Sequence, residues 1–208
     1  MTLKIYGIAA SRALRPLWVA EEMGLTYEHI AQRYQEGATH RSEFLALNPN
    51  GHIPVIDDDG IIVWESMACA LYLARRFGAD RPDSIAPHTH REEAEVLRWT
   101  FWSVTELEKD ALTVLMHRLA MPAEQRKPEL ADAAEKRLAA PLRVLEQHLQ
   151  THTWIAGERF TVADVTVASV ANWVRPAAAL VASLPRTQAW LQACLARPAY
   201  VRAKAMGT

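Results

Sequence analysis

Short apolar runs alternate with helical patterns along the first 78 residues. Four runs of strand length lie at residues 3–6, 27–30, 54–56 and 61–64. Apolar positions at helical spacing, each series followed by a glycine, lie at residues 11–23 and 66–77. The turn Asp57-Asp58-Asp59-Gly60 between the last two runs predicts a hairpin. The order β-α-β followed by β-β-α predicts a mixed four-stranded sheet with helices on its faces.

The remainder of the chain has a helical pattern only. Residues 79–90 hold two prolines and little periodicity, and they predict a linker between a domain at 1–78 and an all-helical domain at 91–208. One predicted apolar face consists of Leu97, Phe101, Val104, Ala111 and Leu115. A second consists of Leu130, Ala134, Leu138, Leu142, Leu145 and Leu149, with Pro141 expected to kink or break that helix. Residues 161–173 are apolar nearly all round, which predicts a central helix of the bundle.

Composition narrows the class of protein. Half of the 208 residues are hydrophobic and the formal net charge is -1, so the sequence predicts a soluble globular protein and suggests neither nucleic acid nor membrane partners. The N-terminal apolar run is too short to predict a signal peptide or membrane span. The two cysteines, Cys69 and Cys194, are expected to be buried thiols in the cytoplasm. The histidines show no paired metal-ligand spacing, so no metal is expected.

The segment NPNGHIPVIDDDGIIVWES, from Asn48 to Ser66, carries most of the candidate chemistry. Base rates favour a trans Ile53-Pro54 bond, but a cis bond there would expose the Ile53 N–H and C=O to the backbone of a bound peptide. Glu65 and Ser66 stand where a strand turns into a helix. They can bind an ammonium and a carboxylate, or they can serve as a plain helix cap.

Three further places carry polar groups. Ser11 follows the first strand, where ligands bind in open α/β sheets, although it can equally be a simple N-cap. No GxSxG motif is present, which argues against a serine hydrolase. His40-Arg41 can meet a carboxylate or can be a solvated loop. Thr161-x-x-Asp164 has the spacing of a structural capping box.

Taken together, these motifs resemble the cytosolic glutathione S-transferase family. The matching pieces, in order and at the family's spacings over essentially the whole chain, are SRALRPLW (11–18), ALNPNGHIPVI (46–56), WES (64–66), YLARRFG (72–78), FTVADVTVAS (160–169) and RPAY (197–200). The resemblance implies a thioredoxin-like N-terminal domain, an all-helical C-terminal domain, a cis Ile53-Pro54 bond and a cytoplasmic homodimer.

The resemblance also implies roles for individual residues. Glu65 and Ser66 would bind the γ-glutamyl end of glutathione, and the backbone of Ile53, before Pro54, would pair with its cysteinyl unit. His40 and Arg41 would lie near the glycyl carboxylate. His52 stands where related classes often have Gln, so this chain departs from the pattern there.

The thiol-activating residue has two candidates. Ser11 matches the serine-type SRxxR pattern of theta-like and phi-like members, including bacterial ones, and we prefer it to Tyr6, which lies in the first strand. A hydroxyl donor would stabilise the glutathione thiolate, because a free thiol of pKa about 8.5 is only a few per cent ionised at pH 7. An apolar pocket, with Trp102 as the candidate wall, would hold the electrophile.

The predicted function is therefore a detoxifying transferase that attaches glutathione, its co-substrate, to small hydrophobic electrophiles. A glutathione-dependent isomerase or peroxidase and a non-catalytic glutathione-binding or regulatory protein are the alternatives.

Overall fold

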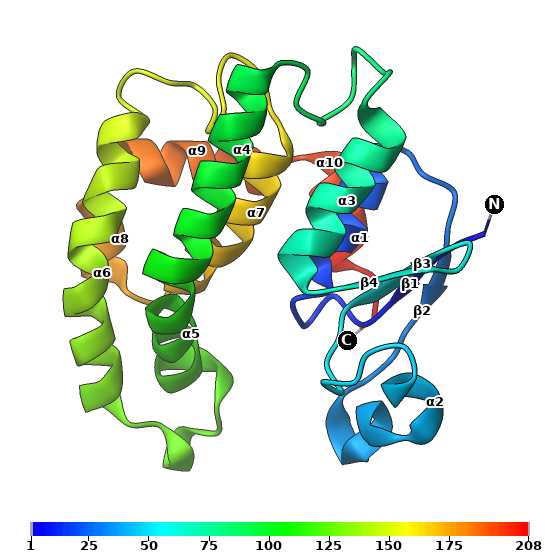
Figure 1. The fold of residues 1–208 in the computed structure, drawn as a ribbon. Coiled ribbons are helices and arrows are strands. Elements are labelled where there is room, and N and C mark those ends of the chain that lie inside the picture. The colour runs from blue at the N-terminus through cyan, green and yellow to red at the C-terminus, as the bar shows by residue number, and fades with distance from the viewer. Residues whose placement is uncertain (1, 208) are drawn as a thin grey trace. The chain divides into compact units, whose positions relative to one another are not determined.

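The computed structural model describes residues 2–207, and these form two compact units. The first unit extends to His88 and includes the segment from Ala196 onward, whereas the second spans Thr89–Leu195. The elements of the first unit are β1 (Leu3–Tyr6), α1 (Leu14–Glu22), β2 (Glu28–Ile30), η1 (Gln35–His40), α2 (Ser42–Leu45), β3 (Val55–Asp58), β4 (Ile61–Trp64), α3 (Ser66–Gly78) and α10 (Pro198–Lys204) (Figure 1). Those of the second are α4 (His90–Trp102), η2 (Ser103–Glu108), α5 (Lys109–Leu115), η3 (Met116–Ala120), η4 (Ala123–Gln125), α6 (Pro128–His148), α7 (Val162–Ala171), η5 (Asn172–Val174), α8 (Ala178–Ala182) and α9 (Pro185–Leu195).

The four strands form one mixed sheet in the order β2-β1-β3-β4, which confirms the prediction. β1 runs parallel to β2 and antiparallel to β3, and β3 runs antiparallel to β4. A parallel pair needs a crossover connection, and α1 supplies it. The β3–β4 hairpin turns at Asp59 and Gly60, whose φ angles of 54° and 95° are the positive values that a tight hairpin turn requires.

Helices cover both faces of this sheet. In the ribbon, α1 and α3 lie on one side of the sheet and α2 on the other (Figure 1). Along β1, Leu3 and Ile5 are buried, whereas the Tyr6 ring meets Phe44 of α2 with 6.5 Å between ring centroids. Side chains of successive strand residues point to opposite faces, so this alternation assigns each helix to its layer.

The last helix belongs to the first unit. α10 packs on α1, where the Tyr200 ring lies 4.8 Å from that of Trp18 and Arg197 donates two hydrogen bonds to Glu22, at 2.6 and 2.7 Å. The compact units therefore differ from the expected domain at 91–208, because the residues from Ala196 onward belong to the first unit. The reason is tertiary: the Tyr200 ring of α10 and the Arg197 side chain just before this helix both have their partners on α1.

In the second unit, α7 occupies the centre, and all ten of its residues are buried. The predicted capping box is present: the Thr161 N–H donates to Asp164 at 2.8 Å, and the Thr161 hydroxyl accepts from the Ala163 N–H at 3.3 Å. Asp164 also accepts from the Ile155 N–H and the Trp190 ring N–H, both at 2.9 Å. Complete burial raises the pKa of Asp164 to about 6 despite these donors.

The apolar face predicted for α4 is wrong in its first half. Leu97, Phe101 and Val104 are exposed, Phe101 by 61%. The buried face includes Val96, Thr100, Ser103, Leu107, Ala111 and Val114, of which only Ala111 was predicted. Its polar members are buried because their hydroxyls are paired: Thr100 with Thr166 at 2.9 Å, and Ser103 with the Thr100 carbonyl at 2.8 Å.

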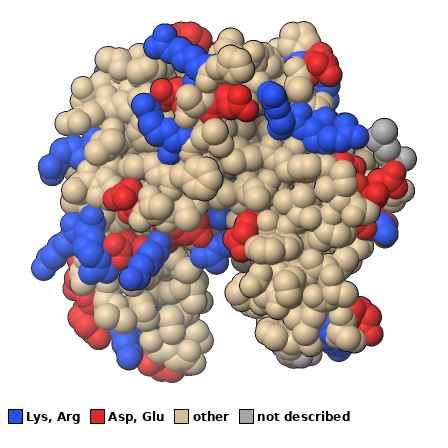
Figure 2. All heavy atoms as spheres, viewed as in Figure 1, with Lys and Arg blue, Asp and Glu red and all other residues tan. Residues whose placement is uncertain are grey.

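The second predicted face, on α6, is buried except for Leu130, which is 42% exposed. α6 continues through Pro141 as one helix. Cys69 and Cys194 are both buried, as expected. Within residues 2–207 no helix combines the length and the apolarity that crossing a bilayer demands. Cationic and anionic side chains are interspersed over the surface shown in Figure 2, consistent with the near-zero net charge.

Candidate functional site

Ser11 lies in the turn that leads from β1 into α1, and it is partly exposed. Its hydroxyl donates to the Ile8 carbonyl at 2.7 Å and accepts from the Ala13 N–H at 3.1 Å. The hydroxyl that was predicted to activate a thiol therefore already has an acceptor. It must rotate away from Ile8 before it can donate to a ligand.

Gly7 allows this turn to approach the loop before β3. Its φ is 134°, and a Cβ added there would lie 2.5 Å from the Ala13 Cβ and 3.4 Å from the Ile53 Cβ. A side chain at position 7 would therefore clash with Ala13. The positive φ of Gly7 is also a backbone conformation that residues with a Cβ rarely adopt. The start of α1 and the Ile53 loop consequently lie side by side.

The Ile53-Pro54 bond is cis, as the family resemblance implied and the base rate did not. Among the described residues, neither the N–H nor the C=O of Ile53 has a hydrogen-bond partner. The loop is held from behind by Asn48, whose side-chain amide donates to the His52 carbonyl at 2.7 Å. The His52 side chain is exposed. The loop thus offers one backbone donor and one acceptor to an extended ligand.

Glu65 and Ser66 form the junction of β4 and α3. Glu65 is exposed and has φ 71° and ψ 115°, outside the regions that a residue with a Cβ prefers. Such a conformation costs about 1–3 kcal/mol and is concentrated at functional sites. Ser66 is the first residue of α3 rather than its cap, and it is buried. Its hydroxyl and the first N–H groups of the helix are groups whose chemistry favours an anion.

Arg15 is a member of this site that the sequence reasoning missed. It is only 2% exposed, and its Nη1 donates to the Ser66 Oγ at 2.7 Å. The signal was present as the second arginine of SRxxR, one helical turn beyond Ser11 and among buried residues of α1. The partner, 51 positions away, is brought near by the packing of α1 against α3.

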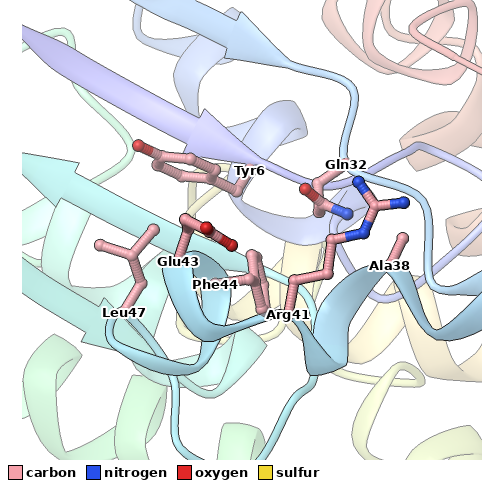
Figure 3. A pocket seen from close by; sticks show the side chains of 7 residues that line it. All are labelled: Tyr6, Gln32, Ala38, Arg41, Glu43, Phe44 and Leu47. Atoms are coloured by element: carbon pink, nitrogen blue, oxygen red, sulfur yellow. The ribbon is translucent and has the colours of Figure 1, made fainter.

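His40 and Arg41, predicted as a pair, have different surroundings. The His40 ring lies close to Gly51, where an added Cβ would be 3.1 Å from its Nε2. Arg41 instead lines an open hollow of about 560 Å³ on the α2 side of the sheet, together with Tyr6, Gln32, Ala38, Glu43, Phe44 and Leu47 (Figure 3). Ser11, Ile53, Glu65 and Ser66 are not among the residues that line this hollow.

Tyr6, the alternative thiol-activating residue, therefore belongs to the α2 side of the sheet, where its ring packs edge-on to Phe44. Trp102 lies in the second unit. It is partly buried, and its ring is 4.8 Å from that of Trp99 in an edge-on contact. Its role as a pocket wall stays a prediction.

The first unit is thioredoxin-like, with unpaired backbone groups at a cis-proline loop and a hydroxyl at a strained helix start, and an all-helical unit follows it. This combination defines a class of two-domain proteins in which a thioredoxin-like unit, with backbone groups suited to an extended ligand, precedes a helical unit. Two family models match in the same order: the glutathione S-transferase N-terminal domain over residues 1–75 and the C-terminal domain over residues 109–198. The chain belongs to the glutathione S-transferase family.

Individual relatives agree with this membership. "Glutathione S-transferase GstB" of Escherichia coli K12 is 33% identical over 88% of this chain and 88% of its own length. The solved apo structure of glutathione S-transferase III is 31% identical, has a TM-score of 0.85 and matches over 99% of this chain and 96% of its own. A theta-class glutathione S-transferase from Xanthomonas axonopodis pv. citri, solved with glutathione bound, is 26% identical with a TM-score of 0.84 over 99% and 98% of the two chains.

Proposed function

We propose that this glutathione S-transferase attaches glutathione to small hydrophobic electrophiles and that it is a serine-type, theta-like or phi-like member of the family. The observation that carries the proposal is the start of α3, where Glu65 has a strained backbone and Ser66 presents a buried hydroxyl beside unpaired helical N–H groups. A strained residue persists only where its surroundings hold it in place, and it is typical of a ligand clamp.

The roles follow from the chemistry of glutathione. The Glu65 carboxylate binds the γ-glutamyl ammonium, and Ser66 binds the adjacent carboxylate. The unpaired N–H and C=O of Ile53 pair with the cysteinyl unit, as an added strand would. His40, Arg41 and His52 are assigned to the glycyl end, with His40 favoured by its position beside Gly51.

Ser11 then stabilises the thiolate. Its turn lies beside the Ile53 loop, whereas Tyr6 packs against Phe44 in the hollow on the α2 side of the sheet, and this difference supports Ser11. The thiolate is the nucleophile, so the protein needs only to lower the thiol pKa and to hold an electrophile against the sulfur. Trp102 is our candidate for the apolar contact with that electrophile.

We further propose that the protein acts as a cytoplasmic homodimer. The exposed Leu97, Phe101 and Val104 on one side of α4 and η2 support a covered apolar surface in the assembled protein. Light scattering at micromolar protein checks the proposal, because a homodimer has twice the mass of the 23.3 kDa chain.

The central test is Ser66→Ala. Loss of a hydrogen bond to a charged group should weaken glutathione binding by about tenfold or more in calorimetry. Ser42→Ala is the matched control, because Ser42 is also the first residue of a helix but is exposed on α2. Equal affinities of the two variants for glutathione would remove the γ-glutamyl assignment.

A panel of electrophiles, peroxides and isomerisable thioesters, each assayed with glutathione, separates transferase from peroxidase and isomerase activity. Conjugate formation supports the proposal, whereas turnover of peroxide alone would replace it. Failure of the protein to bind immobilised glutathione would instead indicate a regulatory protein that has lost the ligand.

A further inference from the structure

We propose that Arg15 is a positioning residue for glutathione: its guanidinium holds the Ser66 oxygen as an acceptor, so that the Ser66 hydroxyl proton is directed to the ligand. The inference deepens the proposed function and rests on it, because it takes Ser66 to bind a carboxylate.

The contact joins two buried groups from different helices. Arg15 on α1 is 2% exposed, Ser66 on α3 is 5% exposed, and 2.7 Å separates Nη1 from Oγ. A guanidinium is rarely buried, because removing its charge from water costs several kcal/mol. A buried arginine whose nitrogen lies on a serine hydroxyl is therefore a specific arrangement rather than a solvated surface contact.

Only one assignment of donor and acceptor is possible for the contact between Arg15 and Ser66. A guanidinium has only N–H donors and does not lose its proton in proteins, so Ser66 must accept. A serine hydroxyl has one proton, and for the Ser66 proton no acceptor is found among the described residues. Arg15 thus leaves the hydroxyl with a single remaining function, which is to donate.

The surroundings of Ser66 favour a carboxylate as the acceptor. At the start of α3 the Cys69 N–H already bonds to the Glu65 carbonyl at 2.8 Å, and the N–H groups of residues 66–68 precede the first helical acceptor. These N–H groups, the Ser66 hydroxyl and the positive end of the helix dipole all stabilise an anion.

The alternative is that Arg15 only holds α1 against α3. The two roles predict different results when Arg15 and Ser66 are changed together. A purely structural arginine contributes to stability independently of Ser66. A positioning arginine contributes to glutathione affinity only while the Ser66 hydroxyl is present.

A double-mutant cycle separates them. Glutathione affinity by calorimetry, kcat at saturating glutathione and thermal unfolding are measured for the wild type, Arg15→Met, Ser66→Ala and the double variant. We expect Arg15→Met to weaken glutathione binding by about tenfold, to change kcat at saturating glutathione by less than about twofold, and to add no more than about twofold to the effect of Ser66→Ala.

Two further variants keep the test decisive. Arg15→Lys retains the charge and a donor, and it should restore part of the affinity even if Arg15→Met folds poorly. Arg197→Met removes a partly exposed arginine that pairs with Glu22 in the same unit, and it should leave glutathione affinity unchanged.

Two results would overturn the inference while the proposed function stands: Ser66→Ala weakens binding but Arg15→Met does not, or the two effects multiply in the double variant. Unchanged binding in Ser66→Ala refutes the proposed role of Ser66 itself, and the inference with it.

Discussion

Ser11→Ala tests how much a hydroxyl that already has an acceptor can lower the pKa of the glutathione thiol. In the structure the hydroxyl donates to the Ile8 carbonyl at 2.7 Å. Donation to a thiolate gains about 1.5–3 kcal/mol, and giving up the neutral bond to Ile8 costs about 0.5–1.5 kcal/mol. The net is on the order of 1.4 kcal/mol, which corresponds to about one pKa unit.

The consequence depends on pH. Below the pKa of the wild-type complex the thiolate population is proportional to 10 raised to minus the pKa. Ser11→Ala should therefore lower turnover by about tenfold there. The difference should shrink as pH rises and vanish above the pKa of a free thiol, roughly 8.5. Ultraviolet titration of the bound thiolate gives the pKa directly, and a pH series of kcat/KM gives the rate.

Ser183→Ala is the matched control. Its hydroxyl makes the same bond to the carbonyl three residues earlier, also at 2.7 Å, on the surface of the second unit. It should change neither the thiol pKa nor turnover. The reasoning is refuted if Ser11→Ala leaves the thiol pKa unchanged. In that case Tyr6→Phe becomes the variant to measure.

Two other predictions concern strain and a buried carboxyl group. Glu65→Gly should raise the free energy of unfolding by up to about 1 kcal/mol while weakening glutathione binding, because glycine adopts the φ of 71° without strain but has no carboxylate. Urea denaturation and calorimetry measure the two effects, and stabilisation with unchanged affinity would exclude Glu65 from the site. Asp164 has a pKa of about 6 in the folded state, above its unfolded value of roughly 3.9, so the folded protein keeps a proton that the unfolded chain releases between these values. The free energy of unfolding should therefore fall as pH rises from about 4 to about 6. Asp164→Asn should flatten that decline in a pH series of urea denaturation. An equal slope in both proteins would contradict the raised pKa of Asp164.

Local signals were sufficient for the elements of the first unit. The short apolar runs, the Asp57–Gly60 turn and the glycines after the helices predicted β-α-β followed by β-β-α, and the structure has these elements in that order, with η1 and α2 between the two halves. The Thr161–Asp164 capping box also followed from sequence, because both of its partners lie within four residues. Glu65 and Ser66 were found as candidates because a strand-to-helix junction can be read from the local sequence.

Other features depended on distant partners. The sequence by itself determined which residues can donate, accept or be buried, because those properties belong to the side chain and its near neighbours. Only the tertiary structure decided that Thr100 lies inside and Phe101 outside, because the Thr100 hydroxyl pairs with Thr166, which is 66 positions away and is not shown by the helical period. In the same way it turned Arg41 toward a separate hollow and joined Arg15 to Ser66 across 51 positions. A hydrogen bond is made by whichever group the fold brings within about 3 Å, and packing sets that distance.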